Sequence, residues 1–513
     1  MKSLHVKKEY MIVFLLFLLL WSALSIFTHT IHSGFQLTDD YIILQIKNSI
    51  DKNGLLNTLI TYITPEFSQR LRPLYTPFKI LRTVVFGDNY SLWSLHLLIS
   101  AVISSFLFYL FARLINFSIF ESALFSIFSL MGYQAIIWFH LCYDETLGVI
   151  FLSFALFFLA MSVYKERHQR LFTSLFTLFT VLMAMCKEPF ILLIPAMIYL
   201  KHQIISQKLN IPILKSLKTD YQSFALFLIF FISIIYLKFG IKTIDFGYCG
   251  LSGFDPIGYI KSFLSLSSLS HGMNYIVLTI ALFCCLPKKH SIMVKFFREN
   301  AHIFTIFLLI ILPQCIIYTK SGFYARYLTP ALIGYSYLTV NLLRFFRTNI
   351  RSKVMFFIVY FLVILSVISI SIETIKTTKY YASKGIAAQS VLNLINSKVE
   401  SDKKILIAGD ITMNFEQTQA FKNYLELQKN KKTNIYFYPL ILNNPSKLSP
   451  FETKLISQFK NSYNDKIQNN IDKNISVIIV FKNVYENFLF KNKKYLNDFT
   501  LYDYNNFKVY IKN

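Results

Sequence analysis

Two adjacent carboxylates, Asp39 and Asp40, follow the first apolar segment of this 513-residue chain by a few positions. Paired carboxylates at a membrane face can hold a divalent cation such as Mg²⁺ or Mn²⁺, or one of them can act as a general base. A second pair, Asp144 and Glu145, stands between two later apolar segments, shortly after His140. Asp39 and Asp40 are the candidate catalytic residues. All four carboxylates are candidate metal ligands, and no other cofactor is expected.

Basic residues occur in comparable places. Lys187 and Glu188 stand between two apolar segments, and Arg326 and Tyr327 precede another. The planar fork of an arginine suits a phosphate or pyrophosphate, whereas a lysine meets a phosphate as a point charge. The candidate substrate- and phosphate-binding residues are Arg70, Arg72, Lys187, Arg326 and Tyr327. The candidates for positioning an acceptor or a metal are His140, Asp144, Glu145 and Glu188.

Each of these features also has a purely structural explanation. Thr38–Asp40 could cap the helix that follows it, and Asp144–Glu145 could be a hydrophilic turn. Lys187 and Glu188 could neutralise one another, and Arg326 could anchor its helix at the membrane surface together with Tyr327. We retain them as functional candidates because charge is costly within or beside a bilayer.

The elements that must position these residues are membrane helices. The chain is 54% hydrophobic, with a mean hydropathy of +0.47. A helix needs about 18 or more apolar residues to cross the hydrocarbon. We expect about eleven transmembrane helices, near residues 11–31, 91–114, 119–138, 147–164, 171–186, 188–200, 221–239, 273–287, 302–319, 326–343 and 355–375. The two shortest, 188–200 and 273–287, are candidates for tilted or re-entrant segments.

Basic residues indicate the orientation, because they collect on the cytoplasmic side. They gather near the N-terminus and in alternate loops, at 165–170, 201–218, 288–298 and 344–353. We therefore expect a multi-pass protein of the inner (plasma) membrane with a cytoplasmic N-terminus. Much of the net charge of +25 would face an anionic leaflet, so we expect membrane lipids as partners and exclude nucleic acid. The candidate residues then share the outer side, where the only arginines are Arg70, Arg72, Arg82 and Arg326.

Three large regions are expected on that side. The loop at 32–90 contains short apolar stretches at 41–46 and 55–63, which suit helices along the membrane surface. The loop at 240–272 is rich in glycine and serine, and its central Asp255-Pro256 predicts a turn-rich flap. The tail predicts strands at 405–409, 434–438 and 477–481, helices at 415–428 and 450–459, and a hairpin at 501–511. Residues 376–513 are therefore predicted to form a small, periplasmic or extracellular α/β domain, joined by a helix at 376–399 to the membrane domain, 1–375.

Several of these residues occur in an order that resembles the GT-C superfamily of membrane glycosyltransferases. They are Asp39-Asp40 after the first span, Arg72-Pro73-Leu74, Phe86-Gly87-Asp88-Asn89 with Trp93 and His96, Lys187-Glu188-Pro189, and Arg326–Pro330. That superfamily includes the protein O-mannosyltransferases and the aminoarabinose transferases of lipid A. The resemblance covers roughly residues 1–375.

The resemblance implies transfer of a sugar from a polyprenyl-phosphate donor to a glycan, lipid or protein acceptor on the outer face. Asp39 or Asp40 would deprotonate the acceptor hydroxyl, and the anomeric carbon would be inverted, as in inverting glycosidases. Lys187 and Arg326 would stabilise charge on the leaving phosphate. The alternatives are a polysaccharide polymerase or ligase with a lipid-linked substrate, and a non-catalytic lipid or solute transporter. A transporter predicts facing charges at mid-membrane and two similar halves, and the sequence shows neither.

Overall fold

The computed structural model describes residues 2–218, 220–241, 255–284, 290–321, 323–349, 352–400, 403–427, 434–441, 450–468 and 470–513. Within these ranges, seven helices have the length and apolarity to cross a membrane, or eight if the bent pair α12 (Pro256–Ser268) and α13 (Met273–Cys284) is one span. The chain is therefore a multi-pass helical membrane protein. The total of eleven spans stays a prediction.

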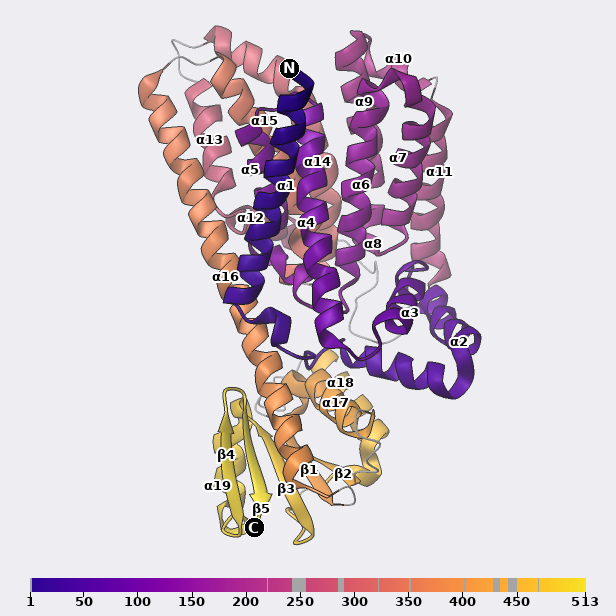
Figure 1. Cartoon of the computed structure of the whole chain (residues 1–513), viewed down its shortest axis with the longest axis vertical. Helices are drawn as coiled ribbons and strands as arrows, with labels where there is room; N and C mark the ends of the chain where they lie inside the picture. Colours follow the sequence, from indigo (N-terminus) through magenta and orange to yellow (C-terminus); the bar gives the residue numbers. More distant parts are fainter. Residues whose placement is uncertain are drawn as a thin grey trace.

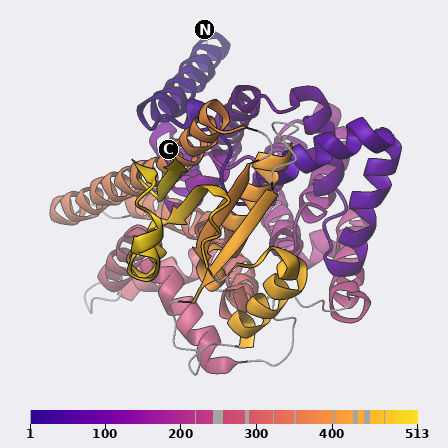
Figure 2. The same ribbon diagram turned by 90° about the horizontal axis from the view of Figure 1, so that it is seen from below.

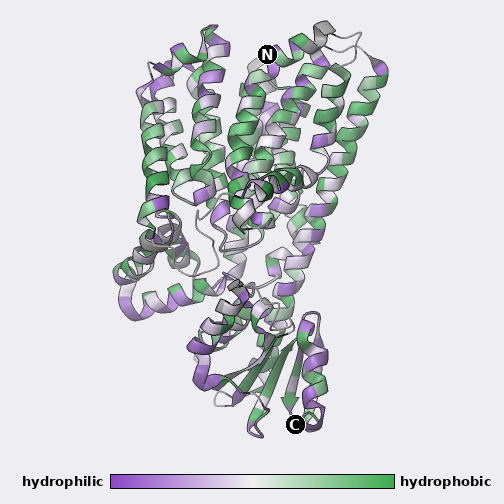
Figure 3. Cartoon of the chain, turned by 180° about the vertical axis from the view of Figure 1, so that it is seen from behind, coloured by the Kyte–Doolittle hydropathy of each residue, from purple (hydrophilic) through white to green (hydrophobic). Residues whose placement is uncertain are grey.

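The helices form a bundle with the N-terminus at one end and a small C-terminal domain at the other (Figure 1). Apolar residues dominate the bundle, and hydrophilic residues become frequent in the C-terminal domain (Figure 3). Besides α12 and α13, the long helices are α1 (Lys2–Phe27), α4 (Tyr90–Leu114), α5 (Ile119–Leu130), α6 (Asp144–Tyr164), α7 (Gln169–Ala184), α9 (Ile194–Leu209), α11 (Tyr221–Ile235), α14 (His290–Ser321), α15 (Thr329–Asn349) and α16 (Lys353–Lys398). Two short helices, α8 (Glu188–Ile191) and α10 (Ile213–Lys218), complete this part.

Two of the predicted spans have different bounds in the structure. The span expected at 119–138 is broken, because α5 ends at Leu130 and a short 3₁₀ helix covers Tyr133–Trp138. Gly132, between them, has a φ of 101°, a conformation that glycine adopts readily and that a helix cannot contain. The short segment expected at 188–200 belongs to a longer apolar unit, Glu188–Leu209, formed by α8 and α9.

The loop at 32–90 contains two helices, α2 (Tyr41–Gln69) and α3 (Tyr75–Phe86). The apolar stretches at 41–46 and 55–63 lie in the single helix α2, which bends at Gly54. Helix α3 is an addition to the predicted elements. This helix exposes apolar side chains on one side, while Lys79 and Arg82 on its other side are buried.

The prediction of a turn-rich flap at 240–272 is wrong for the second half of this range. Residues 256–268 form α12, whereas 242–254 lie outside the described residues. Asp255 caps this helix by accepting a hydrogen bond from the amide of Gly258 (2.9 Å), and Pro256 occupies its first turn. Asp-Pro is therefore a helix start here, since an aspartate cap followed by proline favours helix initiation.

The C-terminal domain confirms the predicted α/β fold. Helix α16 continues without a break from the membrane domain to Lys398 and so includes the expected connecting helix. The five-stranded sheet has the order β2-β1-β3-β5-β4, with β1 parallel to both neighbours and β5 antiparallel to both of its own. Its elements are β1 (Lys404–Asp410), α17 (Ile411–Leu427), β2 (Asn434–Leu440), α18 (Pro450–Tyr463), β3 (Ile475–Phe481), α19 (Tyr485–Asn492), β4 (Phe499–Tyr504) and β5 (Phe507–Lys512). Helix α19 is an addition to the predicted elements. Seen from below, the domain lies over the lower end of the bundle (Figure 2).

Candidate active site

Asp40 is fully buried in the loop between α1 and α2. Its two carboxylate oxygens accept hydrogen bonds from the backbone amides of Gln36 (2.9 Å) and Cys142 (3.2 Å). Nδ1 of His140 lies 3.1 Å from Oδ1 of Asp40. Asp40 thus joins the loop after α1 to the segment before α6, and its oxygens are turned toward the protein.

Asp39 has a different environment, although it is the adjacent residue. Its side chain is 36% exposed, and Oδ2 accepts a hydrogen bond from Nη1 of Arg326 (3.1 Å). The guanidinium of Arg326 lies over the rings of Tyr143 (4.7 Å) and Tyr327 (5.1 Å). Desolvation would raise the pKa of Asp39, but positive charge, above all that of Arg326, lowers this pKa below its ordinary value. Asp39 is therefore an ionised carboxylate that is partly exposed at the protein surface.

Five of the other predicted charged residues form a cluster where α6 and α8 begin, and all but Glu188 are buried. Arg72 pairs with Asp144, and its Nε donates to both oxygens of Glu188 (3.1 and 3.3 Å). Nζ of Lys187 lies 2.5 Å from Oε1 of Glu145 and 3.9 Å from Oδ2 of Asp144. Burial lowers the pKa of Lys187, while the two carboxylates oppose this shift. Three carboxylates face two cations, so the cluster has no excess positive charge for a phosphate.

Tyr327 connects this cluster with Asp39. Tyr327 is buried, and Nζ of Lys187 lies 4.8 Å from the centre of its ring. The guanidinium of Arg326 lies over the same ring. Such contacts between a cation and an aromatic face are attractive. Tyr327 therefore helps to hold both cations in place.

His140 and Arg70 lie at the edges of this arrangement. Nε2 of His140 is 2.5 Å from Oγ1 of Thr38, and its ring stacks on Tyr143 with 3.9 Å between ring centres. His140 therefore contacts Asp40 and Thr38 through its two ring nitrogens and Tyr143 through one ring face, and these contacts hold the loop that carries Asp39. Arg70 is half-buried just after α2, where its backbone amide donates to the carbonyl of Glu66 (3.0 Å).

The C-terminal domain contacts the same loop through residues that were not among the predicted site residues. Tyr424 of α17 donates a hydrogen bond to the carbonyl of Gln36 (2.6 Å), and its ring stacks on Phe35. Glu416, two turns earlier on α17, has a raised pKa because of desolvation and because of the negative charge of Asp39. The domain therefore docks beside Asp39 and adds a carboxyl group to its surroundings.

The four carboxylates proposed as metal ligands do not fit a shared divalent-cation site. Asp40 faces backbone amides, and Asp144 and Glu145 face Arg72 and Lys187. Within the described ranges, no group of three or more histidine, cysteine, aspartate or glutamate side chains could hold a metal ion. A hard cation such as Mg²⁺ prefers several oxygen ligands, whereas most of these oxygens face an amide or a cation of the protein.

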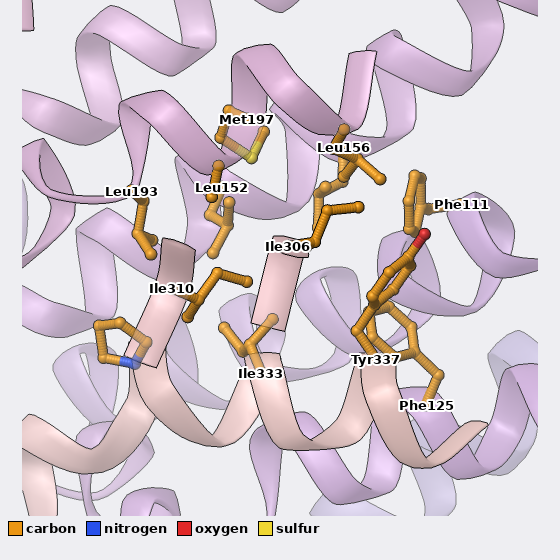
Figure 4. Close-up of a pocket in the computed structure, with 13 residues that line it drawn as sticks. Phe111, Phe125, Leu152, Leu156, Leu193, Met197, Ile306, Ile310, Ile333 and Tyr337 are labelled. Atoms are coloured by element: carbon orange, nitrogen blue, oxygen red, sulfur yellow. The ribbon is translucent and has the colours of Figure 1, made fainter. Parts of the chain in front are cut away.

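An apolar pocket lies inside the bundle, between α4, α5, α6, α9, α14 and α15 (Figure 4). Leu152, Leu193, Met197 and Ile310 are among its lining residues, and the hydroxyl of Tyr337 is the one polar side-chain group there. None of the charged candidate residues lines this pocket, so it has no charged group that could bind a phosphate.

No family model and no curated protein matches this sequence. Two solved structures of ArnT from Cupriavidus metallidurans are similar to it, one bound to undecaprenyl phosphate and one in the apo state. Each has 9% sequence identity and covers 96% of this chain and 97% of that chain, with TM-scores of 0.46 and 0.49. An oligosaccharyltransferase from Archaeoglobus fulgidus, tethered with an acceptor peptide, has 10% identity and a TM-score of 0.48 and covers 98% of this chain and 74% of that chain. ArnT and the oligosaccharyltransferase are GT-C membrane glycosyltransferases, the class that the sequence motifs resemble.

Proposed function

We propose that this protein transfers a sugar from a polyprenyl-phosphate donor to a hydroxyl group of a glycan, lipid or protein acceptor on the outer face of the membrane. The observation that carries this proposal is the environment of Asp39. It is an accessible, ionised carboxylate at one end of a membrane bundle, held by Arg326 beside a dense group of charged residues.

In the proposed reaction, Asp39 accepts the proton of the acceptor hydroxyl. The oxygen then attacks the anomeric carbon, and the bond between that carbon and the phosphate oxygen breaks. The phosphate leaves with the bonding electron pair, and cations at the site stabilise its added negative charge. A base on one side of the sugar and a leaving phosphate on the other produce inversion, by the same geometry as in inverting glycosidases. No step of this scheme requires a metal ion.

Asp40 and the buried ion pairs have a different function in this scheme. Asp40 holds the loop after α1 against the segment before α6, and Arg72 joins the segment between α2 and α3 to α6 and α8. These contacts keep Asp39 in its position. Such positioning contributes to rate because small displacements of a catalytic group are costly.

The test is donor consumption by the purified full-length protein. A panel of polyprenyl-phosphate sugars is incubated with a membrane extract as acceptor, and released polyprenyl phosphate is measured. Asp39→Asn should lower the rate by about 10²–10⁴-fold, the usual contribution of a general base. Asp51→Asn, which neutralises an exposed carboxylate on α2, is the matched control and should keep the rate. Full activity of Asp39→Asn would refute the assignment of the base, and no consumption of any donor by the wild type would refute the proposed function.

A further inference from the structure

Helix α3 carries two cations that the reaction scheme does not use. Lys79 and Arg82 are three residues apart and therefore lie on the same face of the helix. Only 7% of Lys79 and 8% of Arg82 is exposed. Nζ of Lys79 lies 4.2 Å from the ring centre of Tyr75, and the guanidinium of Arg82 lies 5.2 Å from the ring centre of Trp93.

Neither cation has an anionic partner among the described residues. Nε and Nη2 of Arg82 are buried without any hydrogen-bond partner, and Lys79 forms no ion pair within the described ranges. By contrast, Arg72, Arg113 and Arg326 each pair with a carboxylate. An unpaired buried charge destabilises a protein. Two of them on one helical face therefore point to a ligand that supplies the opposite charge.

The position of α3 indicates where such a ligand would come from. Leu81, Val84 and Val85 are exposed on its other face, as in an amphipathic helix that lies in a membrane surface. A helix in this position would lie at the depth of the lipid headgroups.

Two contacts join α3 to the active site. The hydroxyl of Tyr75 donates to the carbonyl of Cys142 (2.5 Å), and the amide of Leu74 donates to the carbonyl of Met185 (3.2 Å), two residues before Lys187. Lys79 is also close enough to Asp39 for its charge to help lower the pKa of that carboxyl. The two free cations thus lie beside the proposed base, on the side of the membrane surface.

We propose that Lys79 and Arg82 form a subsite for a lipid-borne phosphate. A phosphate monoester carries up to two negative charges, which an ammonium and a guanidinium together can neutralise, and the guanidinium can bind it through two parallel hydrogen bonds. Arg72 and Lys187 are already neutralised by carboxylates of the protein, so the uncompensated positive charge lies on α3. The choice of the donor phosphate as the first occupant rests on the proposed function. A phospholipid headgroup offers the same chemistry and is the other source.

The experiment measures lipid binding by the full-length protein in phosphatidylcholine nanodiscs. The probes are undecaprenyl phosphate and phosphatidylglycerol. Lys79→Met and Arg82→Gln remove each charge with little change in volume, and Lys52→Met removes an exposed charge from α2 as the matched control. We expect each α3 variant to weaken binding at least tenfold and the control to stay within twofold of the wild type.

Loss of undecaprenyl phosphate alone identifies the donor phosphate as the occupant, and loss of phosphatidylglycerol identifies a bilayer phosphate. Unchanged binding of both probes in both variants overturns the subsite. The melting temperature without phosphate lipids is the second readout. It should stay constant or rise in Arg82→Gln, because an unpaired buried charge has been removed. A fall instead shows that Arg82 has a structural role and also overturns the proposal.

These results separate the two proposals. A wild type that binds phosphatidylglycerol through Lys79 and Arg82 but consumes no donor retains the subsite and refutes the sugar transfer. Normal transfer together with unchanged lipid binding in both variants refutes the subsite alone.

Discussion

Replacing Asp40 by asparagine should destabilise the protein, whereas the same change at Asp39 should stop the reaction. Asp40 accepts two backbone hydrogen bonds while fully buried. Hydrogen bonds to a charged group contribute about 1.5–3 kcal/mol each, and a buried donor left without a partner costs about 1–3 kcal/mol. Asparagine keeps one carbonyl oxygen and turns its amide group toward the other donor. We therefore expect Asp40→Asn to lower the free energy of unfolding by about 2–4 kcal/mol.

Asp39→Asn should have little effect on stability. The pair of Asp39 with Arg326 is partly exposed, with 36% of the Asp39 side chain and 23% of the Arg326 side chain accessible. Pairs of this kind contribute about 0–1 kcal/mol. A thermal unfolding curve in detergent measures the difference between the variants. At about 2 °C per kcal/mol for a large chain, Asp40→Asn should lower the melting temperature by roughly 4–8 °C and Asp39→Asn by about 2 °C or less.

Both variants are then assayed for transfer at a temperature well below the lower melting point. Folded Asp40→Asn should retain measurable transfer, and Asp39→Asn should retain almost none. The reasoning is refuted if Asp40→Asn melts like the wild type and loses transfer as completely as Asp39→Asn does. That outcome would show that Asp40 takes part in the reaction and does not only position the loop.

Three further predictions concern the surroundings of Asp39. Desolvation raises the pKa of Asp39, but positive charge, above all that of Arg326, lowers this pKa by more, so the net shift is downward. Wild-type transfer should therefore stay constant with falling pH until the pH reaches this lowered pKa and the base becomes protonated. In Arg326→Gln the pKa should rise, and the acid limb of the pH–rate profile should move upward by about 1–3 pH units; an unmoved limb would exclude the pair as its cause. Arg72→Lys should lower the free energy of unfolding by about 1–3 kcal/mol in chemical denaturation, because a single ammonium cannot reproduce the planar fork that meets Glu188 through Nε and Asp144 through Nη1. An unchanged midpoint would contradict this. Tyr424→Phe removes the hydrogen bond to Gln36 and should increase hydrogen exchange in α17, with a cost of about 1 kcal/mol; exchange equal to that of the wild type would show that docking does not depend on this bond.

Features set by local pattern were predictable from the sequence. The span expected at 91–114 corresponds to α4 (Tyr90–Leu114), because the apolar length of a membrane helix is dictated by the bilayer. The hairpin expected at 501–511 corresponds to β4 and β5, and the three parallel strands of the tail lie where buried apolar runs predicted them. In each case a short window of sequence contains the deciding information.

Other features depend on single backbone conformations or on competing local signals. The break after α5 follows from the positive φ of Gly132, and nothing in the apolar pattern of 119–138 reveals that angle. Asp255-Pro256 is compatible with a turn and with a helix start, and the structure selects the second through the hydrogen bond from Gly258. Helix α3 was not predicted because its charged residues Lys79 and Arg82 lie on the buried face and its apolar residues are exposed. An amphipathic helix of a soluble protein has the opposite arrangement.

The difference between Asp39 and Asp40 shows what sequence reasoning lacks at such a site. The charge pattern brings cations and carboxylates to one surface, and the structure shows them together. Which cation meets which carboxylate depends on contacts across 72, 116 and 287 positions of the chain, and the sequence does not specify these pairings. Arg72 and Lys187, expected as phosphate ligands, are already neutralised by carboxylates. A phosphate is attracted most strongly to positive charge that no carboxylate compensates. The unpaired cations of α3 are therefore better candidates for binding a phosphate than Arg72 and Lys187.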